Sequence, residues 1–311
     1  MSAVDFLRLD LPALLTAILA CGICGLLGSF LVLRRDSLLG DALSHAVLPG
    51  IIAGFALTGA RAGLPMLLGA LAAALLAVVA ISLVRRVARL ESGAATGAVF
   101  TSFFALGLML IEATGARSVD LDLDCVLFGQ LEGLVWLEAQ GFGSLLDPTA
   151  LAALPRQLFL LAAVAVVLAG LVALLWRPLH LLCFDPDYAA AIGLPARGLE
   201  LALNLMVAAA AVAAFDAVGS ILVVAMLVCP AAAIRLLTDS YRAQVLGGAV
   251  FGALLGALGY ALAGPLPMAL GHDAALNAAG VIGSLGGLAV AGAMGLRHMR
   301  AKAPKAQIIS G

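Results

Sequence analysis

The amino-acid sequence predicts an all-α integral membrane protein, a polytopic bundle of eight or nine membrane-spanning helices that forms a single domain over residues 1–311. Of the 311 residues, 64% are hydrophobic and only 11% are charged, whereas soluble domains have roughly 45–50% apolar and about 25% charged residues. Apolar runs of about 20 residues, the length that crosses a bilayer, recur along the whole chain. They are continuous and lack the alternation of a membrane β-barrel.

Charge and cysteine content exclude other classes of protein. The 17 Lys and Arg residues balance 18 Asp and Glu residues to a net charge of −1, which leaves no basic surface for a nucleic-acid backbone. Only 5% of the residues are aromatic, so base stacking is not expected either. Five cysteines in a chain of this size do not make a disulfide framework.

Nine apolar segments qualify as spans, of which the fourth and the sixth have the weakest signals. The residues before the first one include Asp5, Arg8 and Asp10 and show neither a positive n-region nor a small-residue cleavage site. We therefore interpret the first segment as a retained span and not as a signal peptide. The predicted spans lie near 12–33, 38–59, 64–84, 95–113, 155–176, 200–217, 219–237, 243–263 and 274–296.

Basic residues predict the orientation, because they accumulate in cytoplasmic loops. With the N-terminus outside and nine spans, the outer face keeps four of them, Arg8, Arg61, Arg117 and Arg156, and the inner face receives the other 13 of the 17. The opposite orientation inverts this bias. We expect a multi-pass membrane protein with a cytoplasmic C-terminus, which ends in a basic tail over 297–311.

Two connections are too long to be simple turns, and connections with structure of their own are usually functional. The outer one, about 114–154, is rich in acidic residues. The inner one runs from Leu179 to Leu199, where Asp185-Pro186 offers a helix start and Gly193 followed by Pro195 a helix stop. A short helix of about two turns is therefore predicted on the cytoplasmic face.

Asp41 and His45 are the strongest candidates for chemistry. Their spacing of four places them on one face of a helix, and ionisable groups inside a span usually mark an ion path. A carboxylate and an imidazole suit Zn²⁺, Mn²⁺ or Fe²⁺. Two ligands are too few, but a C2 homodimer would supply the same pair twice. The alternative is that the two side chains merely pair with each other or with backbone in a packed span.

Three stretches of the sequence resemble a known family. The stretch LLGDALSHAVLPG, residues 38–50, closely resembles the signature of the membrane-spanning subunits of ATP-binding-cassette importers for zinc, manganese and iron. Two more stretches are similar to that family: LDCVLFGQL, 123–131, in the outer loop, and VGSILVVAMLVCPAAAIRLLTDS, 218–240, in a late span. The likeness extends from about residue 12 to residue 296.

The resemblance implies a homodimeric permease of the bacterial inner membrane, with two cytoplasmic ATPases and an extracytoplasmic metal-binding protein as partners. Asp41 and His45 match the Asp and His of the family's ion path, and no cofactor is bound permanently, since the metal is cargo. The stretch about 185–198 matches the coupling helix that docks into the ATPase. Its candidate contact residues are Asp185, Asp187, Ala190 and Gly193.

Other candidates have simpler explanations beside the functional one. Cys21 and Cys24 form a CxxC inside an apolar span, where small residues usually permit close helix packing; a redox or metal role is the alternative. Asp216 either caps the boundary between two spans or lines the outer mouth. Three acidic residues of the outer connection are further candidates for the outer mouth: Asp120, Asp122 and Asp124. They either concentrate cations at the entrance or belong to a solvated loop.

The sequence thus predicts a permease subunit that is not itself an enzyme, because it contains no Walker sequence G-x-x-x-x-G-K-[ST]. It would move a divalent transition metal inward with ATP hydrolysed by a partner. The alternative is a secondary metal transporter driven by an ion gradient, which would show an internal repeat; none is convincing here. An intramembrane zinc protease would need H-E-x-x-H, which is absent. The sequence does not distinguish zinc from manganese or iron.

Overall fold

A computed structural model describes residues 3–58, 63–114, 129, 131–145, 147–269 and 276–302, and every regular element in these ranges is helical. The described helices, two of them short 3₁₀ segments and one a π segment, are α1 (Ala3–Asp5), η1 (Phe6–Asp10), α2 (Leu11–Arg34), α3 (Leu38–Ala46), α4 (Leu48–Thr58), α5 (Gly63–Ala88), α6 (Ser92–Thr114), η3 (Leu131–Gly133), η4 (Phe142–Leu145), α8 (Pro148–Ala152), α9 (Arg156–Leu174), α10 (Trp176–Phe184), α11 (Pro186–Ala191), α12 (Ala196–Val218), α13 (Ser220–Leu237), α14 (Tyr241–Ala263), α15 (Pro265–Ala269) and α16 (Ala278–Lys302).

The expected all-helical membrane architecture is confirmed. Within the described ranges, nine helical segments are long and apolar enough to cross a bilayer, and each overlaps one of the nine predicted spans. They are Phe6–Arg34, Leu38–Thr58, Pro65–Ala88, Ser92–Thr114, Arg156–Leu174, Ala196–Val218, Ser220–Leu237, Tyr241–Met268 and Ala278–Arg300.

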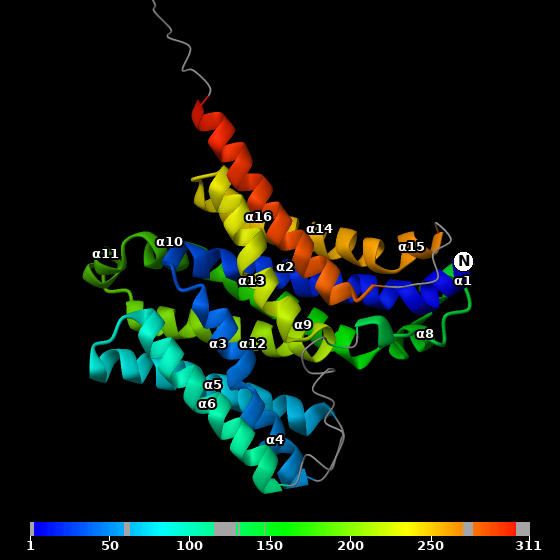
Figure 1. Cartoon of the computed structure of the whole chain (residues 1–311), viewed down its shortest axis with the longest axis horizontal. Coiled ribbons are helices and arrows are strands. Elements are labelled where there is room, and N and C mark those ends of the chain that lie inside the picture. The colour runs from blue at the N-terminus through cyan, green and yellow to red at the C-terminus, as the bar shows by residue number, and fades with distance from the viewer. Residues whose placement is uncertain are drawn as a thin grey trace, which may run out of the picture.

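The centre of the bundle is a seam between α2 and α14, the most extensive helix pair in the described structure. Figure 1 shows α2 running along the long axis with α14 beside it. Gly248, Gly252 and Gly256 recur every fourth residue on α14, and a Cβ on any of them would collide with the backbone of α2. Cys21 is fully buried against this glycine row. The small residues of the first span therefore serve close helix packing, as the packing interpretation of the CxxC predicted.

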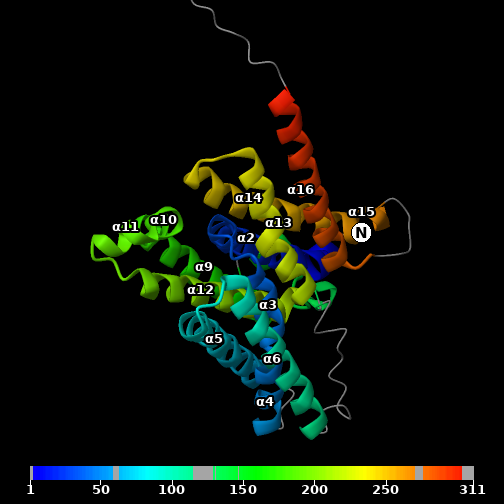
Figure 2. The ribbon, with the colours of Figure 1, turned by 60° about the vertical axis from the view of Figure 1, so that its left-hand side comes forward.

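Helices α3 to α6 form a second group beside this centre, in the lower part of both views (Figures 1 and 2). α4 and α5 lie backbone to backbone, because Gly50 and Gly69 face each other with no room for a Cβ on either. α3 packs on α13, where Gly40 accepts the side chain of Leu227. Small residues of the second span thus contact helices of the same chain.

The outer connection contains helices and a small core of its own. Trp136 is fully buried, and its indole N–H donates to the carbonyl of Ala150 at 2.8 Å. The backbone N–H of Trp136 donates to the backbone carbonyl of Arg8 at 2.7 Å. This hydrogen bond ties the loop to the N-terminal helical segment. Glu132 accepts the first backbone N–H of α16, from Ala278, at 2.7 Å. At least one acid of this loop therefore stabilises a helix start and is not simply solvated.

The inner connection contains the predicted short helix and one that the sequence did not predict. α11 has Asp185 as its N-cap, whose side chain accepts from the Tyr188 N–H at 2.8 Å, and it ends before Gly193, which has a φ of +86°. The helix is confirmed, although α12 already begins at Ala196, inside the predicted range of about 185–198. The unpredicted helix is α10, which follows the fifth span after a single residue. At the C-terminus, α16 continues to Lys302, so the predicted basic tail over 297–311 begins as helix.

Candidate functional site

Asp41 and His45 lie one helical turn apart on α3 and face the same way. His45 Nε2 lies 3.7 Å from Asp41 Oδ1. The His45 side chain is 32% exposed and the Asp41 side chain is 47% exposed. This separation is longer than a hydrogen bond. The pair is therefore neither locked together nor buried in a packed core, and both groups can turn towards a cation.

One side of His45 is covered by α6. The imidazole ring lies 5.4 Å from the ring centroid of Phe100 and 5.8 Å from that of Phe104. This aromatic wall restricts the imidazole to a few orientations and excludes water from one side of it. The open side of the pair is the one from which a cation would have to arrive.

The helix that carries the pair stops directly beyond it. The second span is interrupted at Val47, between α3 and α4. Pro49 lacks the N–H that would donate to the His45 carbonyl, and its ring would clash with that carbonyl in a continuous helix. Interrupted helices at membrane depth are tolerated where they line a cavity or a binding site. The break therefore marks the same place as the two ionisable side chains.

One copy of the chain offers only two ligands at this place. Among the residues that the structure describes, no group of three or more His, Cys, Asp or Glu side chains could hold a metal ion. Divalent transition metals take four or more ligands. If the pair binds a metal ion, its other ligands therefore have to come from outside the described part of this protomer.

An ion network lies at the end of α2 that leads into α3. Glu200 Oε1, in the first turns of α12, accepts from Arg34 Nη2 and from Arg85 Nη1, each at 2.7 Å. Arg34 also lies 3.5 Å from Asp36, and Asp36 accepts from the hydroxyl of Ser92 at 2.5 Å. No local sequence pattern predicts this network, because its members lie up to 166 residues apart. It holds the ends of α2, α5, α6 and α12 together at one end of the molecule.

The candidate docking residues lie around α11, at one extreme of the long axis in Figure 1. Asp187 and Ala190 are exposed, whereas the neighbouring Ala189 is fully buried. Asp185 and Gly193 define the two ends of the helix, so they fix its geometry. Ala190 is thus a residue of the predicted contact set that can be changed without disturbing the packing.

The outer-mouth candidates are placed only in part. Asp120, Asp122 and Asp124 lie outside the described residues. Asp216 is exposed in the last turn of α12, and the N-cap of the next span is Gly219. Gly129, from the predicted LFG element, lies directly against the backbone of Val218 and Gly219. Two of the three stretches that carry the family resemblance therefore meet at the C-terminal end of α12.

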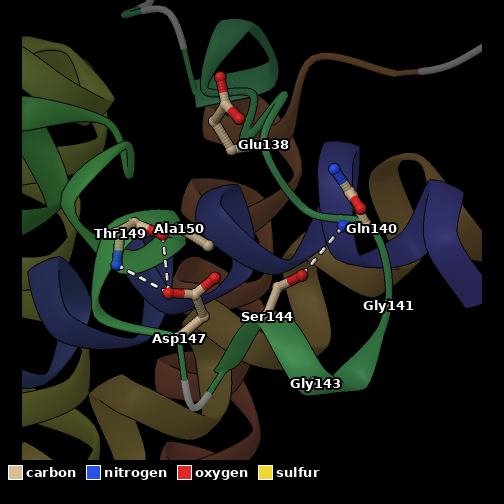
Figure 3. A pocket seen from close by; sticks show the side chains of 8 residues that line it. All are labelled: Glu138, Gln140, Gly141, Gly143, Ser144, Asp147, Thr149 and Ala150. Atoms are coloured by element: carbon tan, nitrogen blue, oxygen red, sulfur yellow. Dashed lines mark hydrogen bonds between the residues drawn. The ribbon is translucent and has the colours of Figure 1, made fainter.

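A polar pocket of about 520 Å³ lies in the outer connection, and Figure 3 shows its lining. Its hydrogen bonds are used within the loop: Asp147 accepts from the N–H and hydroxyl of Thr149, and the Ser144 hydroxyl accepts from the Gln140 N–H. The bonds from Thr149 hold the pKa of the Asp147 carboxyl below its ordinary value. The pocket is thus explained by the turns that build the loop.

Comparison with known sequences gives consistent results. The profile of the ABC 3 transport family matches residues 7–140 and 141–282. The manganese transport system membrane protein MntD of Bacillus subtilis is 38% identical over 245 residues, which are 79% of this chain and 80% of that protein. The zinc transport system membrane protein TroC of Treponema pallidum is 34% identical over 245 residues, 78% of this chain and 76% of that protein.

Solved structures agree with these sequences. The PsaBC complex of Streptococcus pneumoniae contains a chain that superposes with a TM-score of 0.66 at 28% identity, over 92% of this chain and 89% of that one. A transporter described as metal-chelate-type ABC, in an inward-facing conformation, gives a TM-score of 0.64 at 17% identity, over 95% and 87%. The second likeness concerns the fold alone.

Proposed function

The chain belongs to the ABC 3 transport family, and from that premise we propose that it is the permease through which a manganese or zinc importer moves its ion inward, with Asp41 and His45 as ion ligands. It is the membrane component of such a system and not its ATPase subunit. The observation that carries the site is the half-exposed Asp41–His45 pair beside the break in the second span. The relatives named above transport manganese or zinc, and one oxygen and one nitrogen ligand suit both ions.

The proposed ion site is completed by a second copy of the chain. A twofold axis that passes the open side of the pair brings two aspartates and two histidines around one point. Four oxygen and nitrogen ligands replace the water that a divalent cation gives up on entering the membrane. The half-exposure of both side chains in one protomer supports this arrangement, because a site completed within the protomer would bury them.

The proposed mechanism is alternating access, driven from the docking helix. An extracytoplasmic binding protein delivers the ion to the outer face, and ATP-dependent closure of two ATPases acts on α11. Glu200 lies in the first turns of α12, directly after α11, and binds Arg34, which leads into α3. The network therefore offers a continuous chain of contacts from the docking helix to the helix that carries the ion ligands.

Co-purification tests the importer proposal against a gradient-driven carrier. A tagged chain extracted in mild detergent is expected to retain an ATP-hydrolysing partner in a fixed ratio, one ATPase per permease copy. The measurement is the subunit ratio after size-exclusion chromatography, with an unrelated tagged membrane protein as control. A chain that elutes as a stable, partner-free species under all mild conditions would favour the gradient-driven alternative.

The proposed topology has the N-terminus outside and the C-terminus inside. The ion network supports the alternation of the spans, since the ends of the first and third and the starts of the fourth and sixth meet at one face. The assignment of that face to the cytoplasm rests on the distribution of basic residues. A reporter that is active only in the cytoplasm is expected to be active when fused after Lys305. A cysteine introduced in the turn at 61–63 is expected to react with impermeant reagents from outside. Labelling of that cysteine only from the cytoplasm would contradict the topology.

A further inference from the structure

A basic and aromatic cavity of about 410 Å³ lies where α10 meets the start of α14. It belongs neither to the ion site nor to the docking helix. Two segments, separated by about 60 residues of chain, form it. Its lining residues are Trp176, Arg177, His180, Leu181, Ser240, Tyr241 and Arg242.

One wall of the cavity is a fixed aromatic cluster. The Tyr241 ring lies 4.9 Å from the Trp176 ring and 4.5 Å from the His180 ring, centroid to centroid. The Tyr241 hydroxyl donates to the Trp176 carbonyl at 3.3 Å. Tyr and Trp are enriched at membrane interfaces, where an apolar ring and a polar tip meet the headgroup layer. The cluster therefore places the cavity at headgroup depth.

The cations of the cavity have no carboxylate partner in the part of the chain that the structure describes. Arg177 and Arg242 are exposed and make no ion pair or hydrogen bond through their side chains there, and the ring of the exposed His180 contacts only other rings. Three other arginines at the same end are paired: Arg34 and Arg85 with Glu200, and Arg235 with the nearby Asp239. The cavity thus holds two guanidinium groups that can bind an anion bidentately.

Apolar stripes lead from both arginines into the membrane. On α14, every fourth residue after Arg242 is exposed and apolar: Leu246, Val250, Leu254 and Leu258. On α9, an exposed apolar stripe ends just before Arg177; it includes Val167, Leu171 and Leu174. No described residue of the protomer covers either stripe. A ligand that fits this surface has an anionic head and long apolar chains.

We propose that this cavity binds the phosphate headgroup of an anionic phospholipid of the inner leaflet, whose acyl chains lie along the α14 and α9 stripes. Its place in the inner leaflet rests on the topology proposed above, which cysteine labelling tests separately. Basic pockets between spans on the cytoplasmic side are suited to such headgroups. A free phosphate ion would use the arginines but gain nothing from the stripes, so the continuity of the two features favours the lipid.

Lipid binding to the full-length permease, purified with its partners, tests the proposal. Phosphatidylglycerol and cardiolipin are added to delipidated protein, and the retained lipid is measured by native mass spectrometry, with phosphatidylcholine and inorganic phosphate as comparison ligands. The double variant Arg177→Gln/Arg242→Gln is expected to bind anionic lipid about tenfold or more weakly. Arg86→Gln/Arg300→Gln removes the same charge from exposed positions in the last turns of α5 and α16, outside the cavity and the docking stretch, and is expected to bind like the unmodified protein.

Each other outcome overturns the proposal. Equal retention of phosphatidylcholine, or full displacement of the lipid by inorganic phosphate, would mean that the cavity does not select an anionic lipid. Equal binding by both double variants would mean that the attraction is a general charge effect. If the cavity variant keeps its lipid but loses the ATPase subunit, the arginines form a protein contact instead. Elution volume and thermal unfolding are compared among all three proteins and identify a variant that has lost its fold. In that case the double variant Arg177→Lys/Arg242→Lys replaces the glutamine variant.

Discussion

Replacing His45 with alanine is expected to abolish metal uptake while the protein stays folded and in the membrane. In the proposed site the imidazole is one of the two ligands that each protomer supplies, and a twofold site would lose two of its four ligands at once. Loss of partners around a metal typically costs 10–100-fold in affinity even when the ligands remain, so uptake is expected to fall by about 100-fold or more. The measurement is radioactive manganese or zinc uptake, normalised to the assembled permease in the membrane.

Two companion variants separate binding from packing. Asp41→Asn removes the charge but keeps an oxygen, so an intermediate loss of uptake is expected. His45→Leu fills the space against Phe100 and Phe104 with an apolar side chain, so it should keep the fold but not transport the metal. Full transport by a well-folded His45→Leu protein would refute the ligand role and leave Asp41 without a function at this place.

Replacing Ala190 with arginine is expected to uncouple ATP hydrolysis from uptake. Ala190 is exposed on α11, so a large charged side chain there leaves the interior of the permease undisturbed and, with the proposed docking, would meet the ATPase. Uptake per ATP hydrolysed is expected to fall about tenfold or more, because the closure of the ATPases would no longer move α11 and α12 together. ATPase activity and uptake are measured on the same proteoliposomes.

Two alanines nearby serve as controls. Ala189 is fully buried, so Ala189→Arg should lower the amount of folded permease, which identifies misfolding. Ala243 is exposed in the first turn of α14, at the same end of the molecule, and Ala243→Arg should leave coupling unchanged. If Ala190→Arg couples normally and Ala243→Arg does not, docking takes place at the turn between α13 and α14.

Span number and helix ends were predictable because they depend on local sequence. A span needs only length and apolarity, and all nine have both. The start and end of α11 follow from Asp185-Pro186 and Gly193, residues that act on their own neighbours. α10 was missed because it follows the fifth span after a single residue and contains Pro178 near its start, where proline is tolerated.

The candidate site was predictable only as far as one helical face. The spacing of Asp41 and His45 places them one turn apart wherever a helix forms. The aromatic wall over His45 comes from α6, more than fifty residues later, and no sequence feature near His45 predicts it. The Arg34–Glu200 contact spans 166 residues and was likewise invisible. Both depend on how the spans pack, which the apolar pattern of a membrane helix does not encode, since its lipid-facing and protein-facing sides are equally apolar.

The glycine seam between α2 and α14 also determines when the helices can pack together during synthesis of the chain. Ser29 of α2 donates to the Gln244 carbonyl of α14, a residue that a ribosome delivers 215 positions later. At about 5–20 residues per second, α2 waits roughly 10–40 s for its main neighbour. Six further spans enter the membrane in that interval before the seam can close. The seam can therefore close only after the eighth span has been made, and the ninth span, α16, then packs on α13 and α14.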